Sequence, residues 1–319
     1  MIKLILTVSM ALLLAACELT STTLTEPEDA LIVEAYVIVS GAGPFVGATA
    51  TLLVHGVRGS PGSVNGPPSV TATVTDAAGT STTLTEQPIS RCILTGVDAS
   101  DLGRCYAADL PADVQPGATL SLRVEAPGNQ VITGVTTLPD DFQVITPVAH
   151  GQACQLPADT RLEMAWSPSA GAWAYPSEVR FQDLGPQLAA EDPQFTDLAD
   201  PLVIFGLAIS DSDTTISFPN EFGLFDRFDD EIVVRALVEI QDGLPAGVVS
   251  DMTIAAADRN WINWERGGNF NPSGSVRVPS VSGDGFGVFG SMVLKNISIV
   301  VGPPEPGGPP ACTGLSTGP

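Results

Sequence analysis

Lysine is almost absent from this chain, and histidine is nearly as rare. Among 319 residues the only lysines are Lys3 and Lys295, and the only histidines are His55 and His150. Lysine and arginine together number 13, against 36 aspartates and glutamates, which gives a net charge of −23. Nucleic acid binding needs a basic face, so nucleic acid is not expected as a partner. A zinc site or a histidine-based catalytic centre would also have few residues to draw on.

The short motifs of common enzyme and cofactor sites are missing as well. No phosphate-binding loop, serine-hydrolase elbow, zinc-protease motif, calcium loop or Cys-x-x-Cys pair occurs in the sequence. Gly283–Gly287 is similar to a glycine-rich phosphate loop, but no basic residue follows it. We interpret it as a tight crossing into the last strand, in which the glycines supply positive φ angles. We predict no cofactor and no metal.

Two acidic clusters are the remaining candidates for such chemistry. They are Asp226, Asp229, Asp230 and Glu231, and the pair Asp211 and Asp213. Their spacing matches no calcium loop, and a solvated turn before a strand explains them better. A carboxylate pair could also serve a glycan-acting hydrolase, but a chain with 36 acidic residues contains such pairs by chance.

The first 17 residues have the parts of an export signal. Lys3 precedes an apolar run, Leu4–Leu14, that is shorter than the roughly 20 residues needed to span a bilayer. The run ends in Ala15-Ala16-Cys17, which resembles the lipobox of bacterial lipoproteins. That resemblance implies cleavage before Cys17, a diacylglyceryl group on its sulfur, a fatty acid such as palmitate on the new amine, and anchoring in the cell envelope. An ordinary export signal with a chance cysteine at the cut is the alternative.

The four other cysteines suit an oxidising compartment. Cys92, Cys105, Cys154 and Cys312 form an even set that allows three pairings. We favour Cys92–Cys105, which closes a short loop, and Cys154–Cys312, which ties the tail to the second domain.

The composition predicts an all-β fold. Glycine (32) and proline (27) are plentiful while only 15% of residues are charged, which favours short strands joined by many turns. We expect two tandem antiparallel β-sandwiches. The expected order is a signal peptide (1–16), a lipidated tether (17–29), an N-terminal sandwich (30–140), a second sandwich (150–301) and a Pro/Gly-rich tail (302–319), extended and without structure over 302–310.

Apolar and alternating runs locate the strands. In the first sandwich we expect Leu31–Val39, Val46–His55, Ser69–Thr75, Thr82–Thr85, a strand starting at Cys105, Thr119–Ala126 and Val131–Thr137. In the second we expect Arg161–Ser167, Tyr175–Phe181, Thr214–Phe218, Glu231–Ile240 and Gly287–Val301. The stretch from Gly185 to Pro201 is a long loop or a short helix. Trp166 resembles the buried tryptophan of fibronectin type III strands.

The segment from Asp258 to Pro272 has the most unusual composition and is predicted to be a loop. Trp261, Trp264, Arg266 and Phe270 are concentrated there. Tryptophan and arginine dominate contact hot spots, so these four residues are the predicted partner-binding residues. They could equally cap an edge of the sandwich. One of the two tryptophans could contact a partner while the other packs.

Two stretches and the lipobox together resemble one family. The stretches are Ile32–Ala35 in the opening strand and Val278–Ser291 around the glycine crossing. They are similar to the DUF4249 family (domain of unknown function), uncharacterised lipoproteins whose genes often accompany TonB-dependent outer-membrane receptors. Ser280-Val281 departs from the Ser-Asn that usually precedes the glycines of that family. The resemblance implies a transthyretin- or carboxypeptidase-regulatory-like sandwich followed by a fibronectin-like one, and it carries over no catalytic residue.

The sequence therefore predicts a non-enzymatic, lipid-anchored binding or accessory module of the cell envelope, in the outer membrane of a Gram-negative bacterium. The expected partner, besides membrane lipid, is an outer-membrane receptor protein. A glycan-acting hydrolase and a purely structural spacer of the envelope are the alternatives.

Overall fold

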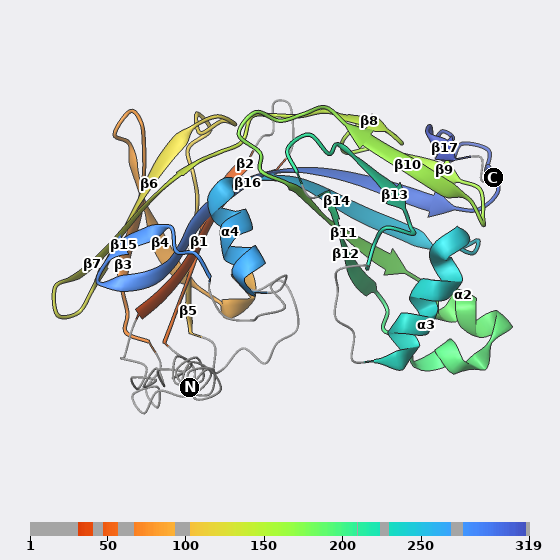
Figure 1. Cartoon of the computed structure of the whole chain (residues 1–319), viewed down its shortest axis with the longest axis horizontal. Coiled ribbons are helices and arrows are strands. Elements are labelled where there is room, and N and C mark those ends of the chain that lie inside the picture. The colour runs from red at the N-terminus through yellow and green to blue at the C-terminus, as the bar shows by residue number, and fades with distance from the viewer. Residues whose placement is uncertain are drawn as a thin grey trace, which may run out of the picture.

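The chain folds into two β-rich lobes that share one long strand (Figure 1). The computed structural model describes residues 31–40, 47–56, 67–92, 103–208, 210–223, 230–268 and 277–316, with 266–268 described by their backbone alone. One large mixed sheet runs through both lobes, and a smaller second sheet belongs to the second lobe. The predicted all-β fold is confirmed.

The first lobe is a sheet that turns back on itself. Its elements are β1 (Leu31–Ser40), β2 (Gly47–His55), β3 (Thr71–Asp76), β4 (Ser81–Gln87), the short helix η2 (Ile89–Arg91), β5 (Arg104–Asp109), β6 (Thr119–Ala126), β7 (Gln130–Thr137), β15 (Val281–Gly283) and the start of β16 (Gly285–Val301). The strand order is β16-β1-β2-β5-β4-β3-β6-β7-β15. Every second side chain of β1 is buried, as expected for a strand with one face on a core. The fold brings β7 onto β16, since Gly134 lies directly against Phe289.

The second lobe packs two sheets face to face. Its strands are β8 (Val144–Thr146), β9 (Ala153–Leu156), β10 (Arg161–Trp166), β11 (Tyr175–Gln182), β12 (Leu202–Ala208), β13 (Thr215–Phe218), β14 (Val249–Ala257), the end of β16 and β17 (Leu315–Ser316). Strands β12, β11, β14, β16 and β9 form one sheet, and β13, β10, β17 and β8 form the other. Aromatic side chains fill the space between them: the rings of Trp166 and Tyr175 lie 5.4 Å apart, and those of Phe181 and Phe218 6.0 Å apart. The burial predicted for Trp166 is confirmed.

Strand β16 belongs to both lobes. Its first ten residues, 285–294, pair in parallel with β1, and residues 292–300 pair antiparallel with β14. Strand β15 pairs with β7, so residues 281–294 of the chain complete the first lobe. The boundary between the lobes therefore falls inside β16, whereas the sequence analysis had placed all of it in the second sandwich.

The glycine crossing before β16 has the predicted conformation. Gly283 and Gly287 have φ angles of 111° and 142°, a region that favours glycine. A Cβ atom on Gly287 would lie 1.8 Å from the carbonyl oxygen of Val33, so only glycine allows this approach to β1. The interpretation of this segment as a tight crossing is confirmed.

The prediction of a strand over 231–240 is wrong, because the structure forms helix α3 (Glu231–Glu239) followed by the short helix η5 (Ile240–Asp242). Asp230 caps α3, its side chain accepting a hydrogen bond from the amide of Ile232 (3.0 Å). Val233 and Ala236 are buried one helical turn apart. The run of β-branched residues suggested a strand, but the helical spacing of its buried positions and its aspartate cap decide the outcome.

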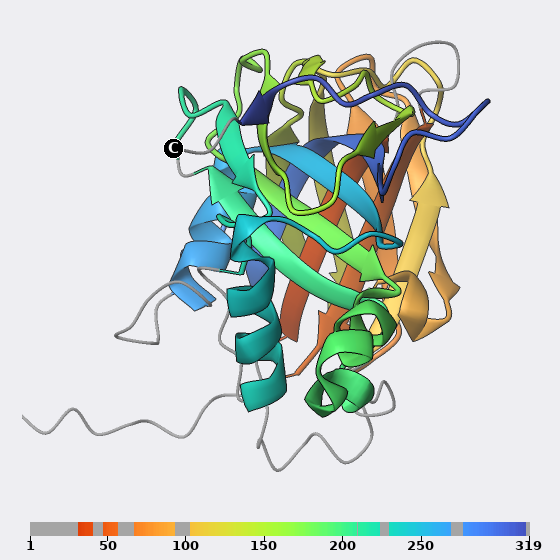
Figure 2. The same cartoon turned by 90° about the vertical axis from the view of Figure 1, so that its right-hand side faces the viewer.

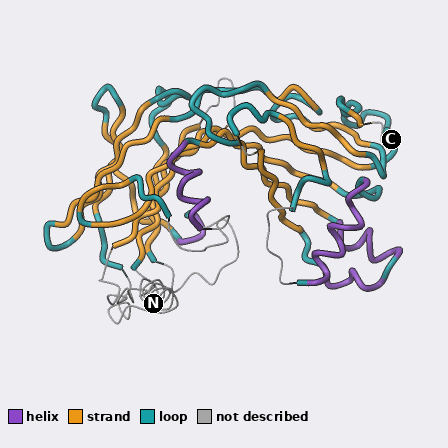
Figure 3. Tube along the Cα trace, in the orientation of Figure 1, coloured by secondary structure: helices purple, strands orange, loops and turns teal. Residues whose placement is uncertain are grey.

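The other helices are short and lie outside the sheets (Figure 3). Helix α2 (Leu184–Glu191) and the short helix η4 (Pro193–Asp197) occupy the stretch for which a loop or short helix was expected. Together with α3 they lie at the far end of the second lobe (Figure 2). Helix α4 (Arg259–Gly268) lies on the side of the first lobe that faces the second (Figure 1). No helix in the described ranges is long and apolar enough to cross a membrane.

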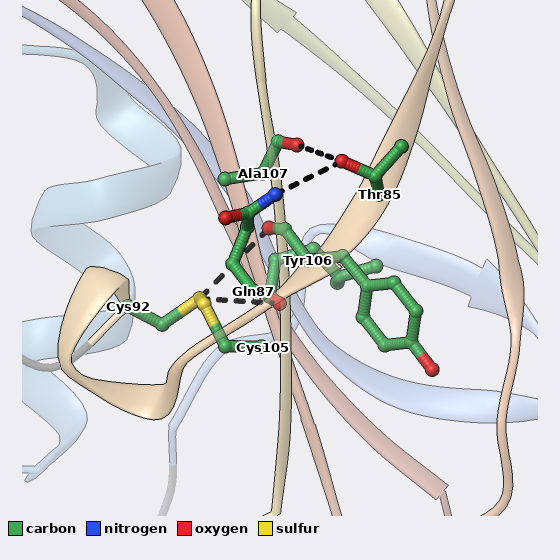
Figure 4. The surroundings of a disulfide bond; sticks show 7 residues. Thr85, Gln87, Cys92, Cys105, Tyr106 and Ala107 are labelled. Carbon is green, nitrogen blue, oxygen red and sulfur yellow. Dashed lines mark hydrogen bonds between the residues drawn. A yellow bond between two sulfur atoms is a disulfide. The ribbon is translucent and has the colours of Figure 1, made fainter.

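Both favoured disulfides are present. Cys92 and Cys105 are joined with an S–S distance of 2.05 Å beside a hydrogen-bonded strand edge, where Gln87 donates to Thr85 and Thr85 donates to the carbonyl of Ala107 (Figure 4). Cys154 and Cys312 are joined with an S–S distance of 2.11 Å.

The second disulfide anchors the C-terminal tail, which was expected to be without structure over 302–310. The carbonyl of Pro310 accepts a hydrogen bond from the amide of Gln155 (2.7 Å), and β17 pairs with β10. The tail is therefore fixed to the second lobe from Pro310 to Ser316.

Candidate functional site

Helix α4 occupies the segment that the sequence analysis predicted to be a partner-binding loop, so the loop prediction is wrong for Arg259–Gly268. Asp258 precedes the helix, and its side chain accepts a hydrogen bond from the amide of Trp261 (2.8 Å). Its carbonyl accepts a bond from the amide of Ile262 (3.2 Å). An aspartate before Arg259–Arg266, a run without glycine or proline, is the signal that could have found this helix.

A buried polar network joins α4 to the first lobe. The Thr136 hydroxyl on β7 lies 2.6 Å from Asp258 Oδ2 and 2.9 Å from the Ser291 hydroxyl on β16. All three residues are almost fully buried. Burial raises the pKa of Asp258, and hydrogen bonds from Thr136, Trp261 and Ser291 oppose that rise. Because Asp258 caps the helix, this network fixes where α4 begins.

Asn260 and Gly290 hold α4 close against the strands. The Asn260 amide donates to the carbonyls of Val135 on β7 and Phe289 on β16, both at 2.9 Å. A Cβ atom on Gly290 would lie 3.1 Å from the backbone nitrogen of Trp261. The helix therefore packs on β16 at a distance that a larger residue would disturb.

The structure separates the predicted partner-binding residues. Trp264 is 2% exposed and packs between the Phe286 ring (5.7 Å) and the guanidinium of Arg277 (4.8 Å). Trp261 is partly buried on the same helix. The side chain of Arg266 and the whole of Phe270 lie outside what the structure describes, as does Cys17. Trp264 is thus a packing residue. A binding surface on α4 must be formed by other residues of the helix.

Arg259, which is exposed, and the half-buried Asn260 and Asn263 line a groove of about 790 Å³ between α4, β6, β7 and the segment before β15. Its polar lining is Thr75, Ser121, Arg123, Thr133, Arg259, Asn260, Asn263, Ser280 and Ser282. Val135 and Val278 add apolar surface and are 56% and 51% exposed. None of the described residues that line the groove is an aspartate or glutamate.

The two arginines of the groove have different partners. Arg123 forms an ion pair with Glu125 on the same strand (2.7 Å), and both side chains are about half exposed. The Arg259 guanidinium lies over the ring of Trp173 in the second lobe, 4.9 Å from the ring centre. The groove therefore carries positive charge at two points on a chain whose net charge is strongly negative.

A cluster of charged residues lies at the opposite side of α4. A carboxylate oxygen of Glu34 on β1 is 3.2 Å from an Arg277 guanidinium nitrogen and 3.4 Å from His55 Nε2. Burial raises the pKa of Glu265 on α4, while Arg277 lowers it and Glu34 raises it further. Burial, reinforced by Glu34 and Glu265, also raises the pKa of Tyr36 well above its ordinary value.

This cluster brings together groups from three distant parts of the chain. Glu34 and Arg277, for example, are 243 positions apart. Two carboxylates in unequal surroundings can serve as a general acid and a general base. Glu34 and Glu265 are therefore candidates for acid–base chemistry. No local motif in the sequence identifies these residues.

The acidic clusters considered for calcium have other roles where they are described. Asp230 caps α3, so it precedes a helix and not the strand that was expected. Asp226 and Asp229 lie outside the described residues. Within the described ranges, no group of three or more histidine, cysteine, aspartate or glutamate residues is arranged to hold a metal ion.

The comparisons with known proteins leave the family open. No protein-family profile and no curated protein matches this chain. A solved structure of a DUF4785 family protein from Legionella pneumophila is similar over 70% of this chain at 12% sequence identity, with a TM-score of 0.20. The match spans about half (51%) of that structure's chain. A likeness this weak carries no argument about function.

Proposed function

We propose that this protein is a non-enzymatic binding module of the cell envelope, and that the groove beside α4 takes an extended acidic segment of a partner protein. The observation that supports this is the lining of the groove, which has two arginines, several amide and hydroxyl groups, two exposed valines and no described carboxylate. Its volume lies in the range of about 300–1,000 Å³ that is usual for binding pockets.

Charge favours this location for an acidic ligand. A net charge of −23 repels acidic partners from most of the surface. The groove is a place where arginine can pair with a carboxylate, and arginine forms two parallel hydrogen bonds to such a group. Positive groups at one place on an otherwise repelling surface would direct an acidic partner to that place.

The resemblance to the lipobox supports a partner in the same membrane. A lipid at Cys17 would hold the folded lobes near the outer membrane, where an outer-membrane receptor is the expected partner. Cys17→Ala should abolish palmitate labelling and release the protein from the membrane fraction. A variant that still labels and stays in the membrane would contradict the anchor.

The groove is tested by recovering partners from detergent-solubilised envelopes with the tagged full-length protein. Arg123→Gln should reduce recovery of the specific partner several-fold, because it removes one of the two positive groups of the groove. Its exposed ion pair with Glu125 contributes little to stability, about 0–1 kcal/mol, so the variant should stay folded.

Arg235→Gln is the matched control. Arg235 pairs with Glu231 on the exposed side of α3, in the other lobe, and its loss should leave recovery unchanged. Equal recovery by the wild type and both variants would remove the groove as the binding site.

The charged cluster around Glu34 supports a second candidate, the glycan-acting hydrolase. In that case Glu265, whose pKa is raised by burial, would be the general acid and Glu34 its partner carboxylate. Release of reducing ends from purified envelope glycans should then be lost in Glu34→Gln and in Glu265→Gln. No release by the wild-type protein from any glycan tested would leave the binding module as the function.

A further inference from the structure

Lys295 is fully buried at the point where the two lobes meet. It lies in β16 opposite Ile254 of β14, and its side chain has 0% exposure. Its Nζ atom is 2.5 Å from Oδ1 of Asp141, in the segment that connects β7 of the first lobe to β8 of the second. The centre of the Phe142 ring lies 5.7 Å from Nζ.

A charged Lys295 side chain lacks hydrogen-bond acceptors at this position. An ammonium group has three hydrogens to donate, and burying it without acceptors costs several kcal/mol. In the part of the chain that the structure describes, no group accepts a hydrogen bond from Nζ at ordinary geometry, even though Oδ1 is only 2.5 Å away. The Nζ atom is therefore close to Asp141 Oδ1, but the two groups are not oriented to form a hydrogen bond.

We propose that Lys295 and Asp141 form an intramolecular isopeptide bond, an amide between Lys Nζ and Asp Cγ. The Asp141 side chain is 40% exposed, but Nζ is fully buried, and a neutral amide nitrogen with one hydrogen to donate suits that position better than an ammonium group with three. Lys295 is the only lysine in the described chain, and the fold places it against a carboxyl group on a segment that is distant in sequence.

The reaction balances without an added reagent. Proton transfer from the ammonium to the carboxylate gives a neutral amine and a neutral acid. The amine lone pair then attacks Asp141 Cγ to form the C–N bond. One C–O bond of the carboxyl group breaks, and its oxygen leaves as water after taking the proton lost by the nitrogen.

His150 lies near enough to this pair to be influenced by the charges of Lys295 and Asp141. Burial, with the charge of Lys295 as a second cause, lowers the pKa of His150, which keeps the ring neutral near pH 7. His150 Nδ1 accepts a hydrogen bond from the amide of Asn296, the residue after Lys295 (2.8 Å). With Nδ1 accepting that bond, the neutral ring carries its hydrogen on Nε2, so His150 can donate a hydrogen bond but takes no proton in the reaction.

Peptide mapping of the protein purified from membranes tests the bond directly. Reduction and alkylation must come first, because Cys154–Cys312 joins the same two tryptic peptides, 124–161 and 278–319. Trypsin does not cleave after an acylated lysine. We expect the two peptides to stay joined after reduction, uncut at Lys295, with a mass below their sum by one water molecule.

Two variants complete the test. Asp141→Ala should lose the joined peptide entirely, and Asp140→Ala, which removes the neighbouring carboxylate, should retain it. Cleavage of the wild-type protein after Lys295, giving separate peptides 278–295 and 296–319, would overturn the proposal. That outcome is read on the wild type, so it stands even if Asp141→Ala fails to fold.

Discussion

The guanidinium of Arg259 lies 4.9 Å from the centre of the Trp173 ring, and this contact joins α4 to the second lobe. Trp173 precedes β11, and its amide also donates a hydrogen bond to the carbonyl of Ala257, two residues before the helix (2.8 Å). Because α4 also packs on β16 in the first lobe, it contacts both lobes. Because α4 lines the groove, the shape of the groove depends on how the two lobes are joined.

The first prediction concerns the two tryptophans near α4. Trp264→Ala should lower the free energy of unfolding by about 3–5 kcal/mol, because the ring is 2% exposed and packs on Phe286 and Arg277. Trp173→Ala is the control: its ring is 43% exposed, and its contact with Arg259 should be worth about 0.5–1 kcal/mol. Chemical denaturation of the full chain measures both. A loss for Trp264→Ala as small as the ~0.5–1 kcal/mol expected for the control would mean that Trp264 is not a packing residue.

A second prediction concerns the close approach of α4 to β16. Gly290→Ala should destabilise the protein by about 1–3 kcal/mol, because the new methyl group would lie 3.1–3.2 Å from backbone atoms of Trp261. Gly47→Ala adds the same methyl group at a position with nothing within 4 Å and should have little effect. Thermal melts of the two variants separate these cases, and a Gly290→Ala melt like that of the wild type would show that α4 can move away without cost.

The third prediction is a pH dependence that arises from Glu265. Burial raises its pKa in the folded protein above the unfolded value of about 4.3. The folded state therefore keeps this proton to higher pH than the unfolded chain does. The stability that this provides is fully present below the unfolded pKa, and it is lost as the pH rises through the folded pKa.

Glu265→Gln cannot ionise, so its free energy of unfolding should fall less than that of the wild type as the pH rises from about 4 to 7. Urea denaturation at a series of pH values gives the comparison. Glu239→Gln, at the exposed end of α3, controls for the loss of one carboxylate elsewhere. Parallel curves for the wild type and Glu265→Gln would contradict the assignment.

The fourth prediction concerns the disulfides. Thiol titration of the unfolded, unreduced protein should find no free thiol among Cys92, Cys105, Cys154 and Cys312. Replacing Cys154 and Cys312 by serine should cost about 3–5 kcal/mol, because their bond closes a loop with a sequence separation of 158. The Cys92–Cys105 loop has a separation of only 13, so its loss should cost less, about 2–3 kcal/mol. A larger loss for the short loop would show that loop length is not the controlling factor.

The sequence by itself determined strands β1 to β7 of the first lobe and the glycine crossing into β16. The β-branched run at Leu31–Val39, the alternation along Thr119–Ala126, the even set of cysteines and the glycines at 283–287 are local or countable signals, and each predicted its structure correctly. Local signals succeed here because a strand with one buried face must alternate, and because backbone with positive φ excludes most side chains.

Only the tertiary structure decided what surrounds α4. The segments 259–268 and 231–239 form helices because aspartate caps and the burial of one helical face outweigh the loop-like and strand-like composition of the sequence. The groove, the Glu34–Arg277 pair and the Lys295–Asp141 contact each join residues from distant parts of the chain. Their distances depend on β16 pairing with β1 in one lobe and with β14 in the other, a long-range arrangement that leaves no periodic mark on the sequence.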